Sequence, residues 1–385
     1  MWVTLAIVVV LLTLIWSLTG RPKGLPPGPT CYPIIGNVGL FKPSEALKAH
    51  RRLRKIYGDI FTIMIFHKPI IFVHGFDNIR ALLVKHGDIF SDRPRMLSTD
   101  IAEGNGVIWS WGPLWKETRS FSVMTLRKFG FGKRSMESQI MEEVDCLIEK
   151  LGKSENEAFD IKNLLNASTA NVICSLLFDK NLNQTLEDII QAGTETSSTT
   201  LRWALLFLIH YPHWQKRIQK EIDYVIGQGQ PKMEHKEQLP TVEAFMLESI
   251  RVGNTSPLTA PRAAKEDFTY KGHLFPKGTT VLFLLESALM DPETFPEPSK
   301  FKPERFLDDN GRCREDLKDK LISFSVGPRA CLGEALAKME LFLFFVRFLQ
   351  KFQIKPEDPQ CLPPIEGSLG ITHTPNAFNL RLVKR

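Results

Sequence analysis

The stretch Phe324–Gly333 (FSVGPRACLG) decides how this chain is interpreted. Its glycine and proline residues predict a turn, and the apolar, helix-favouring run from Glu334 to Phe352 follows at once. Cys331 is therefore expected at a helix N-terminus, where backbone N–H groups and the helix dipole stabilise a thiolate. The glycines let the backbone pass close to a flat ligand. A buried structural cysteine is the alternative for a lone Cys, and the surrounding decapeptide favours a metal ligand instead.

The composition indicates one large globular unit behind a short N-terminal segment. With 385 residues, 43% hydrophobic and 24% charged, the chain can bury a large core and has no signature of disorder. The net charge of +6 is mild and not gathered in a stripe, which favours an anionic membrane or an acidic partner protein over nucleic acid. The six cysteines are scattered, without a C-x-x-C pair or an H-E-x-x-H motif, so reduced cytosolic thiols are expected and no zinc site.

The N-terminus predicts a membrane anchor. No charged residue occurs from Trp2 to Leu18, and Arg21 and Lys23 follow. Charges after the apolar run suit an uncleaved anchor over residues 1–20 with the body in the cytosol, and a buried core helix is the alternative. Residues 21–36 contain a proline-rich segment that predicts a semi-rigid hinge, and residues 37–385 form the remaining domain.

Periodicity indicates a mixed, helix-dominated fold. Helical patterns cover residues 44–57, 77–86, 171–178 and 186–209, and strand patterns cover residues 60–66, 70–73 and 268–285. We expect a turn at residues 67–69, a hairpin over residues 268–285, and an irregular lid after Arg93.

Two polar motifs lie on predicted helices. Trp115 and Arg119 are four residues apart, so they share a helix face and can reach one acceptor, although an ordinary surface pair is the alternative. Further on, small residues at Ala192 and Gly193 would let a ligand press against the helix. Glu195 and Thr196 would then place an acid and a hydroxyl beside that ligand, as proton delivery requires.

A third group of charges predicts a structural ion triad. Glu248 and Arg251 are three residues apart on one helix, and Arg305 brings a second guanidinium.

These motifs occur in the order found in a known family. Phe324–Gly333 resembles the haem-thiolate signature of cytochromes P450, and the flanking chain resembles the microsomal group called family 2. The resemblance runs from Leu25 to the C-terminus with one large gap. It implies a mainly α fold with a small β-rich lobe built from residues 60–73, 268–285 and about 369–383.

The resemblance implies haem b (iron protoporphyrin IX) as the cofactor, with Cys331 as the ligand of its iron. Thr196 and Glu195 are the implied catalytic residues. The implied cofactor-binding residues are Cys331, Trp115, Arg119, Arg93, Arg262, Arg329, Phe324, Gly333 and Ala192. Of these, the tryptophan and the arginines would contact the haem propionates.

The implied activity is that of a monooxygenase that inserts one oxygen atom from O2 into apolar substrates such as xenobiotics, fatty acids or steroids. Electrons would come from NADPH-cytochrome P450 reductase, with cytochrome b5 as a further partner, at the endoplasmic reticulum membrane with the catalytic domain in the cytosol. The basic residues that could dock the reductase, or simply form a solvated face, are Arg127, Lys128, Lys133 and Arg134.

The spacing of the motifs departs from the family at one place. Roughly a hundred residues are missing near residues 179–186, so the P450 fold is expected to be incomplete. The missing block would hold the helices that cover the substrate pocket, and water would then reach the haem. A second hypothesis is therefore a catalytically inactive variant that binds haem or the reductase without turnover.

Overall fold

The computed structural model describes residues 2–19, 22–32, 34–40, 45–128, 134–153, 156–177 and 183–385. Within these ranges helices predominate and the strands form small sheets, which confirms the predicted fold class. The chain forms two compact units. One comprises Met1–Ile101, Leu258–Ser287 and Val326–Arg329, and the other comprises Ala102–Pro257, Ala288–Ser325 and Ala330–Arg385. The predicted division into anchor, hinge and a single domain stays a prediction.

A four-stranded sheet organises the first unit, in the order β1-β2-β6-β3. β1 (Ile60–Ile65) and β2 (Lys68–Val73) are antiparallel, β6 (Thr280–Phe283) runs parallel to β2, and β3 (Arg262–Ala263) is antiparallel to β6. Five successive residues of β1 are buried, as expected for a continuous apolar strand covered on both faces.

Two details of the predicted strands are wrong. The turn lies at residues 66–67 and not at residues 67–69, because Phe66 adopts a φ of 54° and Pro69 joins the ladder opposite Met64. The predicted hairpin over residues 268–285 contains only β4 (Phe268–Tyr270) and β5 (His273–Phe275). β6 pairs with β2 instead, which places Val281 in the interior.

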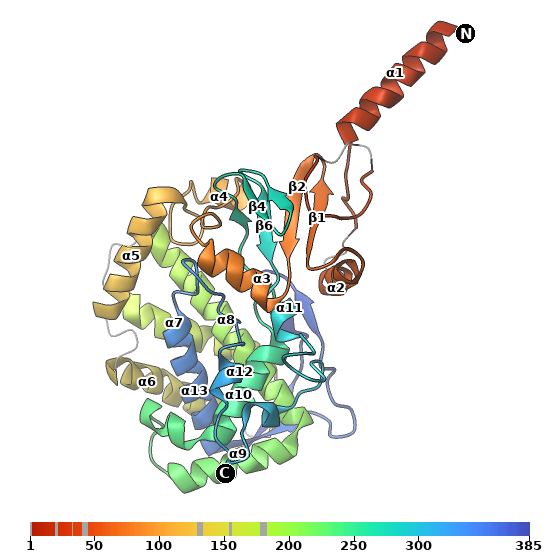
Figure 1. The fold of residues 1–385 in the computed structure, drawn as a ribbon. Coiled ribbons are helices and arrows are strands. Elements are labelled where there is room, and N and C mark those ends of the chain that lie inside the picture. Colours follow the sequence, from red (N-terminus) through yellow and green to blue (C-terminus); the bar gives the residue numbers. More distant parts are fainter. Residues whose placement is uncertain are drawn as a thin grey trace. The chain divides into compact units, whose positions relative to one another are not determined.

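The first unit also contains helices (Figure 1). They are α1 (Trp2–Thr19), α2 (Ala46–Tyr57), α3 (Phe76–Arg80), the π-helical η2 (Ala81–Lys85) and α4 (Leu97–Ile101). α2 is amphipathic and packs Leu53 against the sheet residues Phe61 and Phe72. α4 lies in the stretch after Arg93 that we expect to be irregular, so part of that stretch is helical.

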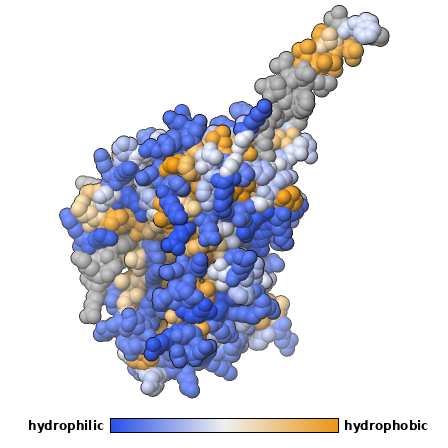
Figure 2. All heavy atoms as spheres, viewed as in Figure 1, coloured by the Kyte–Doolittle hydropathy of each residue, from blue (hydrophilic) through white to orange (hydrophobic). Residues whose placement is uncertain are grey.

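Helix α1 coincides with the predicted anchor. Its described side chains are mostly apolar and exposed, including Trp2, Leu5 and the run Ile7–Leu11 (Figure 2). No helix among the described residues is long and apolar enough to cross a membrane. The side chains at positions 3 and 12–19 lie outside the described part, so the predicted anchor is only partly described.

Helices dominate the second unit. They are α5 (Gly112–Lys128), α6 (Arg134–Leu151), α7 (Lys162–Leu177), α8 (Asn183–His210), α9 (Pro212–Val225), η3 (Met233–Gln238), α10 (Pro240–Gly253), η4 (Pro303–Phe306), α12 (Glu315–Lys318) and α13 (Glu334–Lys351). α11 (Glu286–Leu289) includes the point in the sequence, between Ser287 and Ala288, where the chain leaves the first unit and enters the second. The C-terminal strands are β7 (Phe352–Pro356) paired with β10 (Leu380–Lys384), and the hairpin β8 (Gly367–Leu369) and β9 (His373–Pro375).

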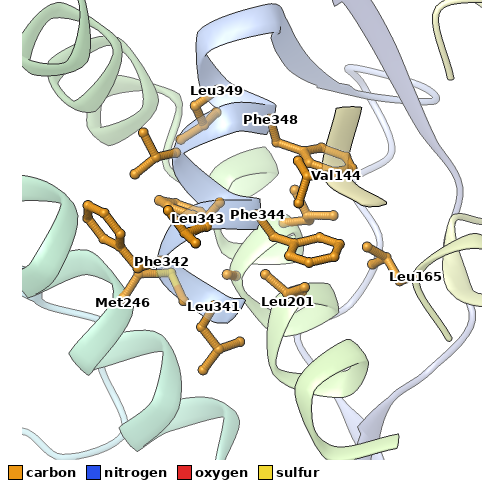
Figure 3. Close-up of a cluster of buried hydrophobic side chains, with 14 of the residues drawn as sticks. Val144, Leu165, Leu201, Met246, Leu341, Phe342, Leu343, Phe344, Phe348 and Leu349 are labelled. Carbon is orange, nitrogen blue, oxygen red and sulfur yellow. The ribbon is translucent and has the colours of Figure 1, made fainter. Parts of the chain in front are cut away.

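Helix α13 lies at the centre of the second unit. It is apolar around most of its circumference, which is typical of a helix packed on several sides. Figure 3 shows its side chains among Val144 of α6, Leu165 of α7, Leu201 of α8 and Met246 of α10. The helix predicted from Glu334 is confirmed, and this packing fixes the loop that precedes it.

The predicted ion triad of Glu248, Arg251 and Arg305 is confirmed. Arg251 donates to both carboxylate oxygens of Glu248, at 2.7 and 2.8 Å, and both side chains are fully buried. Arg305 donates from Nε to the same carboxylate at 3.1 Å, as does the backbone N–H of Lys302 at 2.8 Å. Because every oxygen is engaged, the buried charge is satisfied and the triad connects α10 to η4.

The predicted gap falls on residues that are partly outside the described ranges. Residues 178–182 are not described, and α7 and α8 lie on either side of them. α7 and α8 pack closely, since a β-carbon added at Gly193 would lie 2.3 Å from Cδ1 of Ile173. Gly193 therefore faces α7, and the expectation that its small size makes room for a ligand is wrong. Ala192 is exposed.

Candidate functional site

The segment Phe324–Gly333 forms a closed turn. The backbone N–H of Cys331 donates to the carbonyl of Phe324 at 2.9 Å, and Ser325 adopts a φ of 60°. Gly333 is the N-cap of α13, whose first turn is closed by the N–H of Ala337 donating to the Gly333 carbonyl. The sequence therefore places Cys331 where predicted, directly before the N-terminus of a packed helix.

Gly327 has a steric requirement that the sequence could not specify. It adopts a φ of 81°, and a β-carbon there would lie 1.8 Å from the carbonyl oxygen of Leu83 in η2. A β-carbon added at Gly87 would likewise lie 2.6 Å from Cδ of Pro328. Only glycine fits at position 327, because both the backbone conformation and the contact exclude a side chain.

Cys331 combines an exposed residue with a partly desolvated sulfur. The residue is exposed, while neighbouring protein atoms desolvate its sulfur enough that burial raises the pKa of the thiol. The backbone N–H of Gly333 and the Arg119 guanidinium oppose this shift and favour the thiolate, whereas Glu334 raises the pKa further. A bound cation would deprotonate such a thiol outright. A β-carbon added at Gly333 would meet no atom within 4 Å, so there is open space beside this residue.

Arg119 connects α5 to the cysteine turn. Its Nη2 donates to the carbonyl of Ala330 at 2.7 Å, one residue before Cys331. Burial lowers the pKa of this guanidinium, and the charge of a Cys331 thiolate raises it. Trp115 is buried one turn earlier on α5, on the same face, as predicted from the spacing of four residues.

Three of the predicted arginines meet within the first unit. Arg93 donates to the carbonyls of Ala260 and Pro261, at 3.1 and 2.7 Å. Arg262 donates to the carbonyl of Arg329 at 3.4 Å, and Arg329 donates to the carbonyl of Ser91 at 2.9 Å. Arg262 and Arg329 are both buried. The structure thus brings three guanidinium groups together where residues 91–93, 260–262 and 329 converge.

The polar pair on α8 has a different arrangement from the one expected. The Thr196 hydroxyl donates to the carbonyl of Ala192 at 2.7 Å, four residues earlier. Glu195 accepts a hydrogen bond from the hydroxyl of Thr372, which precedes β9, at 2.8 Å. Among the described residues, neither Glu195 nor Thr196 forms a hydrogen bond with Cys331. The two side chains therefore point in different directions around α8, and Glu195 also fixes the C-terminal hairpin.

Other predicted residues have simpler surroundings. The ring of Phe324 lies 5.6 Å from the ammonium of Lys338, which also pairs with Glu334. Arg127 and Lys128 are exposed at the end of α5. Lys133 and the side chain of Arg134 lie outside the described residues, so the predicted docking patch is only partly described.

Sequence reasoning missed two acidic residues of α8 and α13. Asp188 is buried and accepts from the N–H groups of Val107 and Ile108, at 2.8 and 2.9 Å. Glu340 is buried and bound to Ser197 of α8 at 2.7 Å. The sequence contains a sign of Glu340, because an acidic residue inside the apolar run of α13 is unusual. It contains no sign of the Asp188 contacts, because their partners lie 80 and 81 residues away along the chain.

Comparison with known proteins agrees with this geometry. The family model "Cytochrome P450" matches residues 26–186 and 179–382. Cytochrome P450 2C50 of Mus musculus is 32% identical over 469 residues, which cover 95% of each chain. Cytochrome P450 2C8 of Homo sapiens is 32% identical over 96% of each chain, and cytochrome P450 2B4 of Oryctolagus cuniculus is 31% identical over 95% of this chain and 96% of its own.

Proposed function

Because the chain belongs to the cytochrome P450 family, a family of haem-dependent monooxygenases, we propose that it inserts one oxygen atom from O2 into apolar substrates. The substrate classes we propose are xenobiotics, fatty acids or steroids, with electrons supplied by NADPH-cytochrome P450 reductase. The haem, when bound, supplies the activation of dioxygen that no side chain provides. The observation that carries the proposal is the turn that presents the exposed Cys331 thiol before α13.

Cys331 is the proposed ligand of the haem iron. A single thiolate on a rigid turn suits that task, because thiolate ligation pushes electron density onto the iron and favours O–O cleavage. The Gly333 N–H directed at the sulfur and the nearby Arg119 stabilise its negative charge. Phe324 and Gly333 would flank the haem on the side of the cysteine, and Ala192 would border it from α8.

The arginines are proposed to bind the haem propionates. Arg119 and Trp115 would do so from α5, and Arg93, Arg262 and Arg329 would supply three further guanidinium groups. Guanidinium and carboxylate form strong, charge-assisted hydrogen bonds. The convergence of these three guanidinium groups supports this role.

Thr196 and Glu195 are proposed to handle protons. The Thr196 hydroxyl is part-exposed on α8, and its bond to the Ala192 carbonyl orients the hydroxyl oxygen as an acceptor. Glu195 would have to exchange its Thr372 partner for water to take part. General acid-base assistance of this kind typically contributes about 10²- to 10⁴-fold to a rate.

The proposed setting is the endoplasmic reticulum membrane with the catalytic domain in the cytosol. Support comes from the exposed apolar side chains of α1, which would be unfavourable in water. The exposed Arg127 and Lys128 at the end of α5 support an acidic partner, the reductase or cytochrome b5.

We also propose that an internal block is absent from this chain. The family model is matched in two segments that overlap at residues 179–186, where motif spacing predicts the gap. The alignment with the Mus musculus relative spans 469 residues, whereas 95% of 385 residues is about 366, so about a hundred positions have no counterpart here. This observation favours the second function, an inactive variant that binds haem or the reductase without turnover.

A reduced, carbon-monoxide difference spectrum of the membrane-bound chain tests the proposal. A strongly red-shifted Soret band is expected from the wild type and not from Cys331→Ala, while Cys361→Ala, which alters another exposed thiol, should retain the band. An identical band in Cys331→Ala would refute the ligand assignment. Product formation with added reductase then separates the monooxygenase from the inactive variant.

A further inference from the structure

A buried carboxyl group that the proposed chemistry does not use lies between two central helices of the second unit. Glu340 is on α13, nine positions after Cys331, and its residue is 1% exposed. Ser197, directly after Thr196 on α8, donates its hydroxyl to Oε2 of Glu340 at 2.7 Å. The contact therefore connects the helix that begins at the cysteine turn with the helix that carries the proposed proton-handling residues.

The second carboxyl oxygen indicates the form of this group. Among the described residues, Oε1 of Glu340 has no hydrogen-bond partner. An ionised carboxylate there would be a buried charge with one hydrogen bond, which is strongly unfavourable. The neutral acid avoids that charge, and burial raises the pKa of Glu340 to about 8.

Charged groups on the surrounding elements are engaged elsewhere. Asp145 of α6 pairs with Arg347, Glu248 of α10 with Arg251, and Lys236 of η3 with Glu243. On α8, Glu195 accepts a hydrogen bond from Thr372, and Arg202 donates to the Pro375 carbonyl. On α9, Glu221 accepts from the N–H groups of Thr241 and Val242. On β7, Lys355 is exposed.

The neighbouring hydroxyls show why the Ser197 contact matters. Thr194, Thr196 and Thr200 each donate to the carbonyl four residues earlier in α8. Such bonds slightly weaken and bend a helix, and Gly193 lowers helix stability further. Ser197 instead donates across to α13, so it holds this intrinsically weak stretch of α8 from outside.

We propose that Glu340 is a positioning residue: as a neutral acid it binds Ser197 and thereby holds the stretch of α8 that carries Thr196 against α13. Its effect on turnover rests on the proposed role of Thr196. Its effect on α8 does not.

Hydrogen exchange of the haem-loaded protein tests the proposal at pH 7. In Glu340→Leu and in Ser197→Ala, we expect the backbone amides of residues 194–200 to exchange roughly fivefold to tenfold faster than in the wild type. The double variant should exchange no faster than either single variant, because both remove the same bond. Glu340→Gln should exchange no faster than the wild type, since its amide oxygen can accept from Ser197.

Gln350→Leu is the matched control. Gln350 is a buried polar residue of α13 that donates to the carbonyls of Gly227 and Gly229, so its removal should leave residues 194–200 unchanged. Wild-type exchange in Glu340→Leu, additive single variants, or equal loosening in Gln350→Leu would each overturn the proposal. Product formed per NADPH is measured alongside: faster exchange with unchanged coupling would support the positioning role and refute the role of Thr196.

Discussion

Replacing Glu340 by glutamine removes one titration and retains shape and hydrogen bonding. Glutamate has an ordinary pKa of 4.5, and burial raises the pKa of Glu340 to about 8 in the folded protein. The folded state therefore holds this proton more tightly than the unfolded chain. The contribution of Glu340 to the free energy of unfolding is greatest below pH 4.5, falls as the pH rises, and levels off above pH 8. At about 1.4 kcal/mol per pH unit, the loss is about 3 kcal/mol at pH 7 and approaches about 5 kcal/mol at higher pH.

Urea denaturation of the wild type and Glu340→Gln at pH 5.5, 7 and 8.5, followed by tryptophan fluorescence, measures this difference. The free energy of unfolding of the variant relative to the wild type should rise by about 3 kcal/mol from pH 5.5 to pH 8.5. Glu237→Gln, which alters an exposed glutamate, is the control and should follow the wild type. Parallel pH dependences for Glu340→Gln and the wild type would show that Glu340 is ionised or hydrated in the folded state, and the reasoning would fail.

Three further predictions concern other polar contacts. Arg251→Met should lower the free energy of unfolding by about 3–5 kcal/mol in urea, because it leaves the Glu248 carboxylate buried with fewer partners, and a loss below 1 kcal/mol would contradict that. Thr196→Ala should lower the product formed per NADPH, whereas Thr194→Ala, which removes a similar hydroxyl bond from the same helix, should not, and equal coupling would refute the proton role. Asp188→Ala should speed hydrogen exchange of the two amides that it binds by roughly tenfold or more, and unchanged protection would show that the contact is unimportant.

The elements predicted best are those whose signal is local. The Cys331 turn, α13 and the Glu248–Arg251 pair follow from residues within one turn or one helix, so their spacing alone predicts them. The errors arise where distant partners decide. β6 leaves the expected hairpin because β2 offers a parallel partner.

The same distinction applies to the site. A spacing of four residues predicts that Trp115 and Arg119 share a face, but it could not identify Ala330 as the acceptor for Arg119. The small size of Gly193 predicts space for a ligand, but the side chain of Ile173 on α7 occupies that space. Glu195 is predicted to lie beside a ligand, and its carboxylate accepts a hydrogen bond from Thr372, near the C-terminus. Such partners are set by tertiary packing, which no local pattern encodes.

The parallel pairing of β2 with β6 has a consequence for synthesis on the ribosome. Val73 faces Phe283, a separation of 210 residues, so the hairpin of β1 and β2 emerges long before its neighbour. At about 5–20 residues per second, the open edge of β2 waits roughly 10–40 seconds for β6. An unpaired apolar strand edge is a template for wrong pairing, so the nascent chain should need a chaperone during that interval. Ribosome profiling combined with chaperone capture would locate that need between codons 73 and 283.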